Sequence, residues 1–326
     1  ILCMVPFMSA CGQLETPEEH LVKAQDYMDK GELQAASIEL RNVLLKAPDM
    51  LEARWLLGKL SIELGDGATA EKEIDRAVQL GLAQEAAQPV KARAIILQGD
   101  FDRLLAATTY LAPGMPKQDQ ALIMGLRGQA YIGKMELDPA REALDEALEI
   151  DPAAVEALVG MASLYGLQRD YAEARIWVQR ALEADDSSGH AWSTLGDIEL
   201  AEGNSKEAEA AFSKAIELQP YTVIYRAKRA MALVQLDRFA DADADLQFLA
   251  TLRLDRHPYV SYVAGINSFK QQKYREAAQA FEVSYQSYPS SLPVLIYLAS
   301  TNHILGNLQQ AIIYAERASN VAPRSL

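Results

Sequence analysis

The chain has 326 residues, a net charge of −14 and a sequence pI near 4.8. Half of its residues are apolar and only 7% are aromatic, a balance that favours helices over strands. An acidic surface repels phosphate backbones and anionic lipid headgroups, so we expect neither nucleic-acid binding nor charge-driven membrane binding.

The first ten residues, ILCMVPFMSA, are mostly apolar and end in small residues, and Cys11 follows them directly. This order is typical of the apolar part of an export signal and its cleavage point. Cys3 and Cys11 are the chain's two cysteines, and they lie too close to the N-terminus to form a disulfide framework. We interpret residues 1–10 as the remnant of a signal peptide whose front is missing, and residues 11–16 as a short tether.

The residues M-S-A-C, ending at Cys11, resemble the bacterial lipobox, in which the cysteine becomes the first mature residue and carries acyl chains. The resemblance implies that Cys11 is lipidated, although Met8 stands where leucine is usual. Gly12 follows where an aspartate would tend to signal inner-membrane retention, so the resemblance points to an outer-membrane protein facing the periplasm of a Gram-negative envelope. Two alternatives remain open: an amphipathic segment with an incidental cysteine, and a plain signal peptide cut elsewhere.

From Pro17 onward the chain repeats with a period of about 34 residues. One position of the period is occupied by alanine in eight places: Ala36, Ala70, Ala140, Ala174, Ala208, Ala242, Ala277 and Ala311. The clearest unit contains Trp192, Leu195, Gly196, Gly203, Ala208, Phe212, Ala215 and Pro220. This pattern resembles the tetratricopeptide repeat, which implies two antiparallel helices per unit.

We therefore predict an all-α fold, a right-handed α-solenoid of about nine tetratricopeptide helix pairs. The predicted units span about 17–50, 51–84, 85–118, 121–154, 155–188, 189–222, 223–256, 258–291 and 292–325. The second helix of the last unit keeps apolar residues, and no capping helix follows Pro323. Because a solenoid needs polar end caps, we expect the array to continue beyond residue 326.

Local signals support this helix pattern. Thr16-Pro17-Glu18-Glu19 has the residues of a helix start with a capping box. Glycines such as Gly203 are expected at the turn inside a pair. We also expect small residues such as Gly196 to lie against large ones such as Phe212, so that the two helices of a pair approach closely.

Residues with catalytic potential do not gather into a motif. His20, His190, His257 and His303 lie in different units, and none has metal-ligand spacing to another histidine or cysteine. The run D-A-D-A-D at 241–245 lacks the glycine and the glutamate of a calcium loop, and we interpret it as a solvated acidic face of a helix. We expect no metal, no cofactor and no enzymatic activity.

Binding is the remaining kind of function. In the fold that the repeat implies, positions 2, 5, 9 and 12 of each first helix line a concave groove. These positions turn apolar late in the chain, and the predicted partner-binding residues are Ile224, Met231, Val234, Tyr259, Tyr262, Ile266 and Phe269. Such a surface would take a partner helix or an extended peptide. The alternative is that neighbouring helices cover these residues.

The front of the chain, from S-A-C through T-P-E-E-H-L-V-K-A-Q-D-Y to E-L-G-D-G-A-T-A-E-K-E-I, resembles one lipoprotein family over residues 9–77. This family comprises the large tetratricopeptide lipoproteins of the PEP-CTERM/exosortase system. The resemblance implies a non-enzymatic scaffold that binds protein partners in exopolysaccharide export and protein sorting. The main alternative is a tetratricopeptide assembly lipoprotein for outer-membrane protein insertion or pilus biogenesis. An enzyme regulator or carbohydrate-binding module is a third hypothesis.

Overall fold

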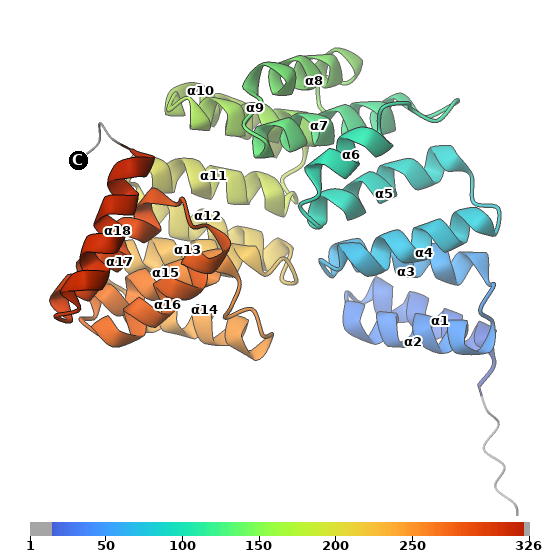
Figure 1. Ribbon diagram of the computed structural model, residues 1–326. Coiled ribbons are helices and arrows are strands. Elements are labelled where there is room, and N and C mark those ends of the chain that lie inside the picture. The colour runs from blue at the N-terminus through green and yellow to red at the C-terminus, as the bar shows by residue number, and fades with distance from the viewer. Residues whose placement is uncertain (1–14, 323–326) are drawn as a thin grey trace, which may run out of the picture. The chain divides into compact units, whose positions relative to one another are not determined.

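Figure 1 shows the computed structural model, which describes residues 15–322. Every regular element in this part of the chain is an α-helix, and there are eighteen of them. The prediction of an all-helical fold is confirmed. No helix in the described range is long and apolar enough to cross a lipid bilayer. Cys11, the predicted lipidation site, lies outside the described residues.

Contacts divide the chain into two units, with the boundary between Ile123 and Met124 inside α7. The helices up to this boundary are α1 (Pro17–Asp29), α2 (Leu33–Lys46), α3 (Leu51–Glu63), α4 (Gly67–Gln79), α5 (Gln84–Leu97), α6 (Phe101–Ala107) and the start of α7 (Lys117–Gly133). The later helices are α8 (Leu137–Ile150), α9 (Val155–Leu167), α10 (Tyr171–Ala184), α11 (Gly189–Glu202), α12 (Ser205–Leu218), α13 (Ile224–Gln235), α14 (Phe239–Thr251), α15 (Pro258–Lys270), α16 (Tyr274–Ser287), α17 (Leu292–Ile304) and α18 (Leu308–Val321).

Consecutive helices form pairs, and the pairs follow one another within each unit. The most extensive contacts lie within pairs such as α1–α2 and α11–α12, and the second helix of a pair also contacts the first helix of the next. This stacking of neighbouring pairs is the arrangement of an α-solenoid.

The turn inside each pair has one residue with a positive φ angle at the same place in the repeat. Glycine takes this place at Gly203 (φ 94°) and Gly306 (φ 79°), as the sequence predicted. Met135 and Arg169 adopt a φ of 61° at the equivalent place. The left-handed conformation costs a non-glycine residue roughly 1–2 kcal/mol. Packing of the two flanking helices must supply that energy.

Polar side chains begin several helices. The Oγ1 atom of Thr16 accepts a bond from the backbone N–H of Glu19 at 3.2 Å, and the Glu19 carboxylate accepts one from the backbone N–H of Thr16 at 2.7 Å. This is the predicted capping box. Asp66 and Asp170 likewise accept bonds from backbone N–H groups in the first turns of α4 and α10. These caps satisfy N–H groups that have no partner inside the helix.

Small residues face large ones in the core. Among the largest completely buried side chains are Phe212, Phe281 and Leu144. An added methyl group on Gly196 would lie 2.5 Å from the ring of Phe212, and one on Gly265 would lie 2.5 Å from the ring of Phe281. The predicted pairing of small with large residues is confirmed at these positions. It lets the two helices of a pair approach closely around a filled core.

The third pair is irregular, because α6 has only seven residues. The side chain of Gln88 in α5 stabilises the non-helical segment that follows. Its Nε2 donates to the carbonyl of Tyr110 at 2.8 Å, and its Oε1 accepts from the N–H of Ala112 at 2.8 Å. The side-chain amide of Gln88 thus bonds backbone groups that would have bonded to other backbone groups if α6 were longer.

The acidic run at 241–245 lies in α14, but only part of it faces solvent. Asp241 is exposed, whereas Asp245 is 3% exposed. The Asp245 carboxylate accepts bonds from Nε and Nη2 of Arg229 at 2.8 and 2.7 Å. The prediction of a solvated acidic face is therefore wrong for Asp245, which forms a buried ion pair with α13.

Candidate binding surface

The first helices of the later pairs form a continuous surface, which we call the first-helix face. Helices α9, α11, α13 and α15 contact one another in this order. Nζ of Lys228 in α13 donates to Asp197 in α11 at 2.6 Å, and Nζ of Lys270 in α15 lies 3.3 Å from the carbonyl oxygen of Val234 in α13. These bonds hold neighbouring first helices side by side.

Three of the seven residues predicted to line an open groove are instead part of the core. Met231 is 9% exposed, Val234 0% and Ile266 7%. They belong to one buried cluster that also contains Val263 and Leu298. The prediction that these three side chains face an open groove is wrong. Helices α13 and α15 pack against each other, and the three side chains are buried in the core cluster.

The other four predicted residues, Ile224, Tyr259, Tyr262 and Phe269, are half-buried and pack against the same core cluster. Each of the four residues remains partly accessible to solvent. A half-buried tyrosine or phenylalanine side chain is held in a fixed position by the core and still offers apolar contact area to a partner. Their role in binding stays a prediction.

Tyr297 of α17, which the sequence analysis did not single out, joins these aromatic residues into a cluster. Its ring stacks on Phe281 with centroids 4.9 Å apart, and it meets the rings of Phe269 at 5.4 Å and Tyr262 at 6.2 Å. We call Tyr259, Tyr262, Phe269 and Tyr297 the aromatic cluster. Gly160 occupies the place of Tyr297 in an earlier pair, where it faces Leu144. In both places the residue lies against the second helix of the preceding pair.

The hydroxyls of Tyr259 and Tyr262 are neutral at physiological pH, because burial raises the pKa of both. Burial raises the pKa of Tyr262 to about 12, and the nearby Tyr297 adds to the shift. Burial also raises the pKa of Tyr259, with a further contribution from the Asp197 carboxylate. A neutral hydroxyl can donate or accept a hydrogen bond to a partner without bringing a charge to the surface.

The earlier part of the first-helix face is polar. Nε2 of Gln129 donates to the carbonyl oxygen of Glu156 at 2.9 Å, and Nδ1 of His190 lies 3.2 Å from the Glu156 carboxylate. Asp197 has a side chain that is 46% exposed. The face thus changes from polar at α9 and α11 to aromatic at α15, which gives it a direction along the array.

Comparison with known families bears directly on these repeating pairs. Three family models described as tetratricopeptide repeat match residues 21–95, 134–198 and 189–222. The chain contains tetratricopeptide repeats. The matched segments lie in both units and include helices α11 and α12, the pair around Gly196 and Phe212.

The curated proteins that match in sequence are much longer than this chain. Human tetratricopeptide repeat protein 7B is 27% identical over 142 residues, which is 38% of this chain and 17% of that protein. General transcriptional corepressor trfA of Dictyostelium discoideum is 26% identical over 121 residues, 37% of this chain and 9% of that protein. The chain therefore spans less than a fifth of the length of either relative.

Solved structures show the same fold at low identity. The Cut9-Hcn1 hetero-tetramer of the APC/C matches with a TM-score of 0.71 and 12% identity, covering 95% of this chain and 74% of that one. Pseudomonas aeruginosa pilF matches with a TM-score of 0.51 and 19% identity over 64% of this chain and 95% of that one. PilW, described as a type IV pilus biogenesis factor, matches with a TM-score of 0.53 and 20% identity, covering 63% of this chain and 94% of that one. At these identities the likeness concerns the fold alone.

One group of side chains in the first tetratricopeptide pair has the composition of a cation site. Glu15, His20 and Glu39 place one ligand atom each within 4.8 Å of the others, and His20 is 7% exposed. Nδ1 of His20 lies 2.6 Å from Glu39, while its Nε2 lies 3.2 Å from Nζ of Lys46. A lysine ammonium only donates, so Nε2 accepts and Nδ1 carries the proton bonded to Glu39. Both ring nitrogens therefore serve a hydrogen-bond network that ties α1 to α2.

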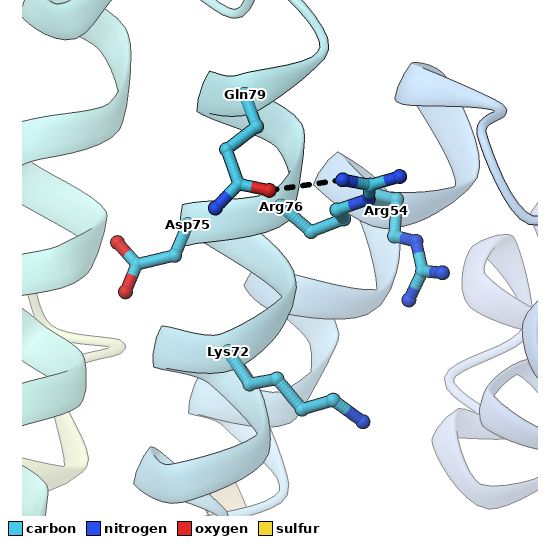
Figure 2. Close-up of a pocket in the computed structure, with 5 residues that line it drawn as sticks. All are labelled: Arg54, Lys72, Asp75, Arg76 and Gln79. Carbon is cyan, nitrogen blue, oxygen red and sulfur yellow. Dashed lines mark hydrogen bonds between the residues drawn. The ribbon is translucent and has the colours of Figure 1, made fainter.

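A pocket of about 400 Å³ lies on the second tetratricopeptide pair, and Figure 2 shows its lining residues: Arg54, Lys72, Asp75, Arg76 and Gln79. Asp75 points away from the three cations. Arg54 pairs with Glu73, Arg76 with Asp49 at 2.6 Å, and Asp75 with Lys91 at 2.6 Å. Lys72 is 77% exposed and lies 3.7 Å from the same Glu73 carboxylate that pairs with Arg54, so the two cations share one carboxylate.

Proposed function

We propose that this chain is a non-enzymatic scaffold that binds protein partners through the first-helix face. The observation that carries the proposal is the aromatic cluster. Tyr262, Phe269 and Tyr297 are held by ring contacts, Tyr259 packs against the same core, and all four remain partly accessible. Tyrosine and phenylalanine offer large contact area with few torsions to immobilise, so they are effective anchors at interfaces. The tetratricopeptide fold supports the proposal, since stacked pairs present extended binding surfaces.

We further propose that the scaffold is a lipoprotein of the Gram-negative envelope, anchored at Cys11 and facing the periplasm from the outer membrane. The apolar run ending in M-S-A-C and the resemblance of residues 9–77 to PEP-CTERM/exosortase lipoproteins support this location. Its partners would then belong to an exopolysaccharide export and protein-sorting system. Labelling cells with a fatty-acid analogue tests the anchor: wild type should be labelled and Cys11→Ala should not. Equal labelling of the two would refute it.

A second candidate function is assembly of a pilus. The observation that favours it is the structural likeness to pilF and to PilW, a pilus biogenesis factor, over about 64% and 63% of this chain. Partners captured from the envelope separate the two candidates, because pilus subunits or secretins indicate the second and polysaccharide-export proteins the first.

A photo-crosslinker tests the binding surface directly. We replace Tyr259 with benzoylphenylalanine in the full-length protein, irradiate cells, and identify the crosslinked proteins by mass spectrometry. The matched control places the same group at Tyr288, which is 58% exposed and lies outside the aromatic cluster. A partner crosslinked at position 259 and not at 288 supports the proposal.

The same partner then allows an affinity measurement. Tyr259→Ala should weaken binding about thirtyfold, as expected for an anchor worth roughly 2 kcal/mol. Thermal unfolding of the variant is measured in parallel, because Tyr259 also packs on the core. Unchanged affinity per folded molecule would show that the tyrosine is structural and that binding lies elsewhere.

A further inference from the structure

The second helix of the first tetratricopeptide pair, α2, exposes two large aliphatic side chains on one side. Leu45 is 80% exposed and Ile38 is 60% exposed. Seven residues separate them, which is two helical turns, so the two side chains point the same way. The buried residues Ala36, Leu40 and Val43 lie on the opposite side of α2. We call the exposed side the outer face of α2, and its four exposed residues are Gln34, Ile38, Arg41 and Leu45.

The exposure of these two places does not depend on where a pair stands in the array. In the seven other described pairs that share the alanine register, the residues at both places are exposed. At the place of Ile38 they are Lys72, Glu142, Ile176, Ala210, Ala244, Gln279 and Ile313. At the place of Leu45 they are Gln79, Glu149, Glu183, Glu217, Thr251, Gln286 and Asn320, all polar. Among these pairs, α2 alone has a large apolar residue at both places, and a neighbouring pair does not cover them.

The outer face of α2 also has an unusual charge for this chain. Arg41 is its one charged residue, and it is positive. The four corresponding places of α8 are all acidic and all exposed: Asp138, Glu142, Asp145 and Glu149. On a chain with a net charge of −14, the outer face of α2 is therefore a local exception, both apolar and positive.

Positive charge continues from α2 to the second pair. Arg41 lies toward that pair, because Glu282, at its place in α16, accepts a hydrogen bond from Tyr314 of the following pair at 2.7 Å. Lys72 occupies the place of Ile38 in α4, and its side chain is 77% exposed. The two cations therefore lie on the same side of the first two pairs as the exposed aliphatic side chains.

The carboxylates around Lys72 are shared with other cations or paired with them. Nζ of Lys72 lies 3.7 Å from Glu73, which already pairs with Arg54. The two aspartates nearby pair with cations of their own: Asp49 with Arg76 and Asp75 with Lys91. The charge of Lys72 is thus available to an anion outside the protein.

We propose that the outer face of α2, together with Lys72 of α4, rests on the surface of a lipid bilayer that contains anionic phospholipids. In this contact Ile38 and Leu45 leave water for the boundary between the headgroups and the acyl chains, which stabilises the bound state. Arg41 and Lys72 donate to lipid phosphates, and an anionic headgroup layer attracts each of these cations.

The proposal rests on the proposed lipid anchor at Cys11, which would bring this face to a membrane. Cys11 precedes Glu15 by four residues, a reach of roughly 14 Å when extended. Nζ of Lys46, the last residue of α2, donates to the backbone carbonyl of Glu15. The chain therefore enters the first pair beside the end of α2 that carries Leu45. An anchor this near raises the local concentration of lipid at the outer face, so a small surface can bind although the net charge opposes binding from solution.

Photolabelling from the bilayer tests which face contacts lipid. The full chain with Cys3→Ser is coupled through Cys11 to a maleimide lipid in vesicles of phosphatidylethanolamine and phosphatidylglycerol that contain a diazirine-bearing phosphatidylglycerol. Mass spectrometry then locates the labelled peptides. We expect label on the outer face of α2 and little on α10, where Ile176 occupies the place of Ile38 and is 53% exposed. Label absent from α2, or equal on α2 and α10, would overturn the proposal.

Chemical coupling separates this proposal from the proposed anchor. The coupled protein is held at the vesicle whether or not cells acylate Cys11, and fatty-acid labelling in cells decides the acylation. A chain that is not acylated in cells contradicts the anchor, whereas a coupled chain without label on α2 contradicts the lipid contact of the outer face.

Variants distinguish the outer face from mere closeness to the tether. Ile38→Glu/Leu45→Glu should lower the label on α2 by about tenfold or more, because it removes aliphatic contact and adds carboxylates beside anionic lipid. Circular dichroism verifies folding, and Leu45→Glu alone serves if the double variant does not fold. The matched control Ile176→Glu should leave the α2 label unchanged. An α2 label that persists in the glutamate variants would overturn the proposal, because closeness to the tether would then explain it.

The contribution of the two cations is measured with a second lipid composition. Arg41→Glu/Lys72→Glu should lower the α2 label on vesicles with phosphatidylglycerol. It should change the label little on vesicles of phosphatidylcholine that contain a diazirine-bearing phosphatidylcholine, because these carry no net charge. An equal effect on both kinds of vesicle would contradict the role of anionic headgroups.

Discussion

Gly196 of α11 lies directly against the ring of Phe212 in α12, so close that a methyl group on the glycine would be 2.5 Å from Cε1 of the ring. Phe212 is completely buried, so other parts of the protein surround its ring. The same relationship recurs between Gly265 and Phe281. It is the repeated contact that sets how closely the two helices of a pair approach.

We predict that Gly196→Ala destabilises the protein by about 1–3 kcal/mol, because the added methyl group forces the ring or the helix to shift. The matched control is Gly166→Ala in α9, where the nearest atom to a new methyl group is 4.0 Å away. Alanine favours a helix interior over glycine, so the control should be neutral or stabilising by up to about 1 kcal/mol. Urea unfolding of both variants measures the difference, and equal effects would contradict the close-contact explanation.

The buried carboxylate of Glu199 should make stability depend on pH. Arg175 donates to it at 2.7 and 2.8 Å and Asn204 donates at 2.7 Å. The bonds from Arg175 lower the pKa of Glu199, with burial acting in the opposite direction and Asn204 lowering it further. A carboxyl whose folded-state pKa is lowered contributes stability above its unfolded pKa, and this stability is lost as pH falls through the folded-state pKa.

Accordingly, Glu199→Gln should cost about 1.5–3 kcal/mol at neutral pH, the range for hydrogen bonds to charged groups. The difference in unfolding free energy between wild type and variant should narrow below about pH 4.3, where the carboxyl becomes protonated in the unfolded chain. Glu207→Gln, at an exposed position in α12, is the control and should have little effect at any pH. A gap that stays constant down to acid pH would show that the charge of Glu199 is not responsible.

Two aspartates of α14 should respond very differently to the same change. Asp245 is buried with Arg229, whereas Asp241 is exposed and pairs with Arg238 at 2.7 Å. Asp245→Ala leaves a partly buried guanidinium without its partner and should cost about 3–5 kcal/mol. Asp241→Ala removes a surface ion pair and should cost about 1 kcal/mol or less. Thermal unfolding compares the two, and a small loss for Asp245→Ala would contradict the assigned ion pair.

The features that the sequence predicted correctly are local or repeat at a fixed spacing. The helix start at Thr16 depends on four adjacent residues, and the turn at Gly203 depends on one residue with a positive φ angle. The contact of Gly196 with Phe212 follows from a position that recurs in each repeat. Such signals need no knowledge of which surfaces meet in space, so a single sequence is enough to detect them.

The features that the sequence did not predict depend on contacts between successive pairs. Helical spacing placed Val234 and Ile266 on one side of their helices, but it did not show that a neighbouring helix covers that side. Asp245 was expected in solvent because its partner, Arg229, is sixteen residues away. The contact of His20 with Glu39, nineteen residues away, could not be predicted from the sequence for the same reason. Each of these depends on the packing of two helices, which residue spacing along one helix does not encode.

The capping box at Thr16 leads to a prediction about local stability. Its two bonds satisfy the backbone N–H groups of Glu19 and of Thr16 itself at the start of α1. Thr16→Ala removes one of them and should cost about 1 kcal/mol. In an array of pairs that contact only their neighbours, such a loss acts first on the terminal pair. We therefore expect faster hydrogen exchange in α1 and little change in α3 or α4. The control variant Thr16→Ser keeps the hydroxyl, and its amides should exchange at the wild-type rate. If Thr16→Ala lowers protection equally across the first three pairs, the cap stabilises more than its own helix.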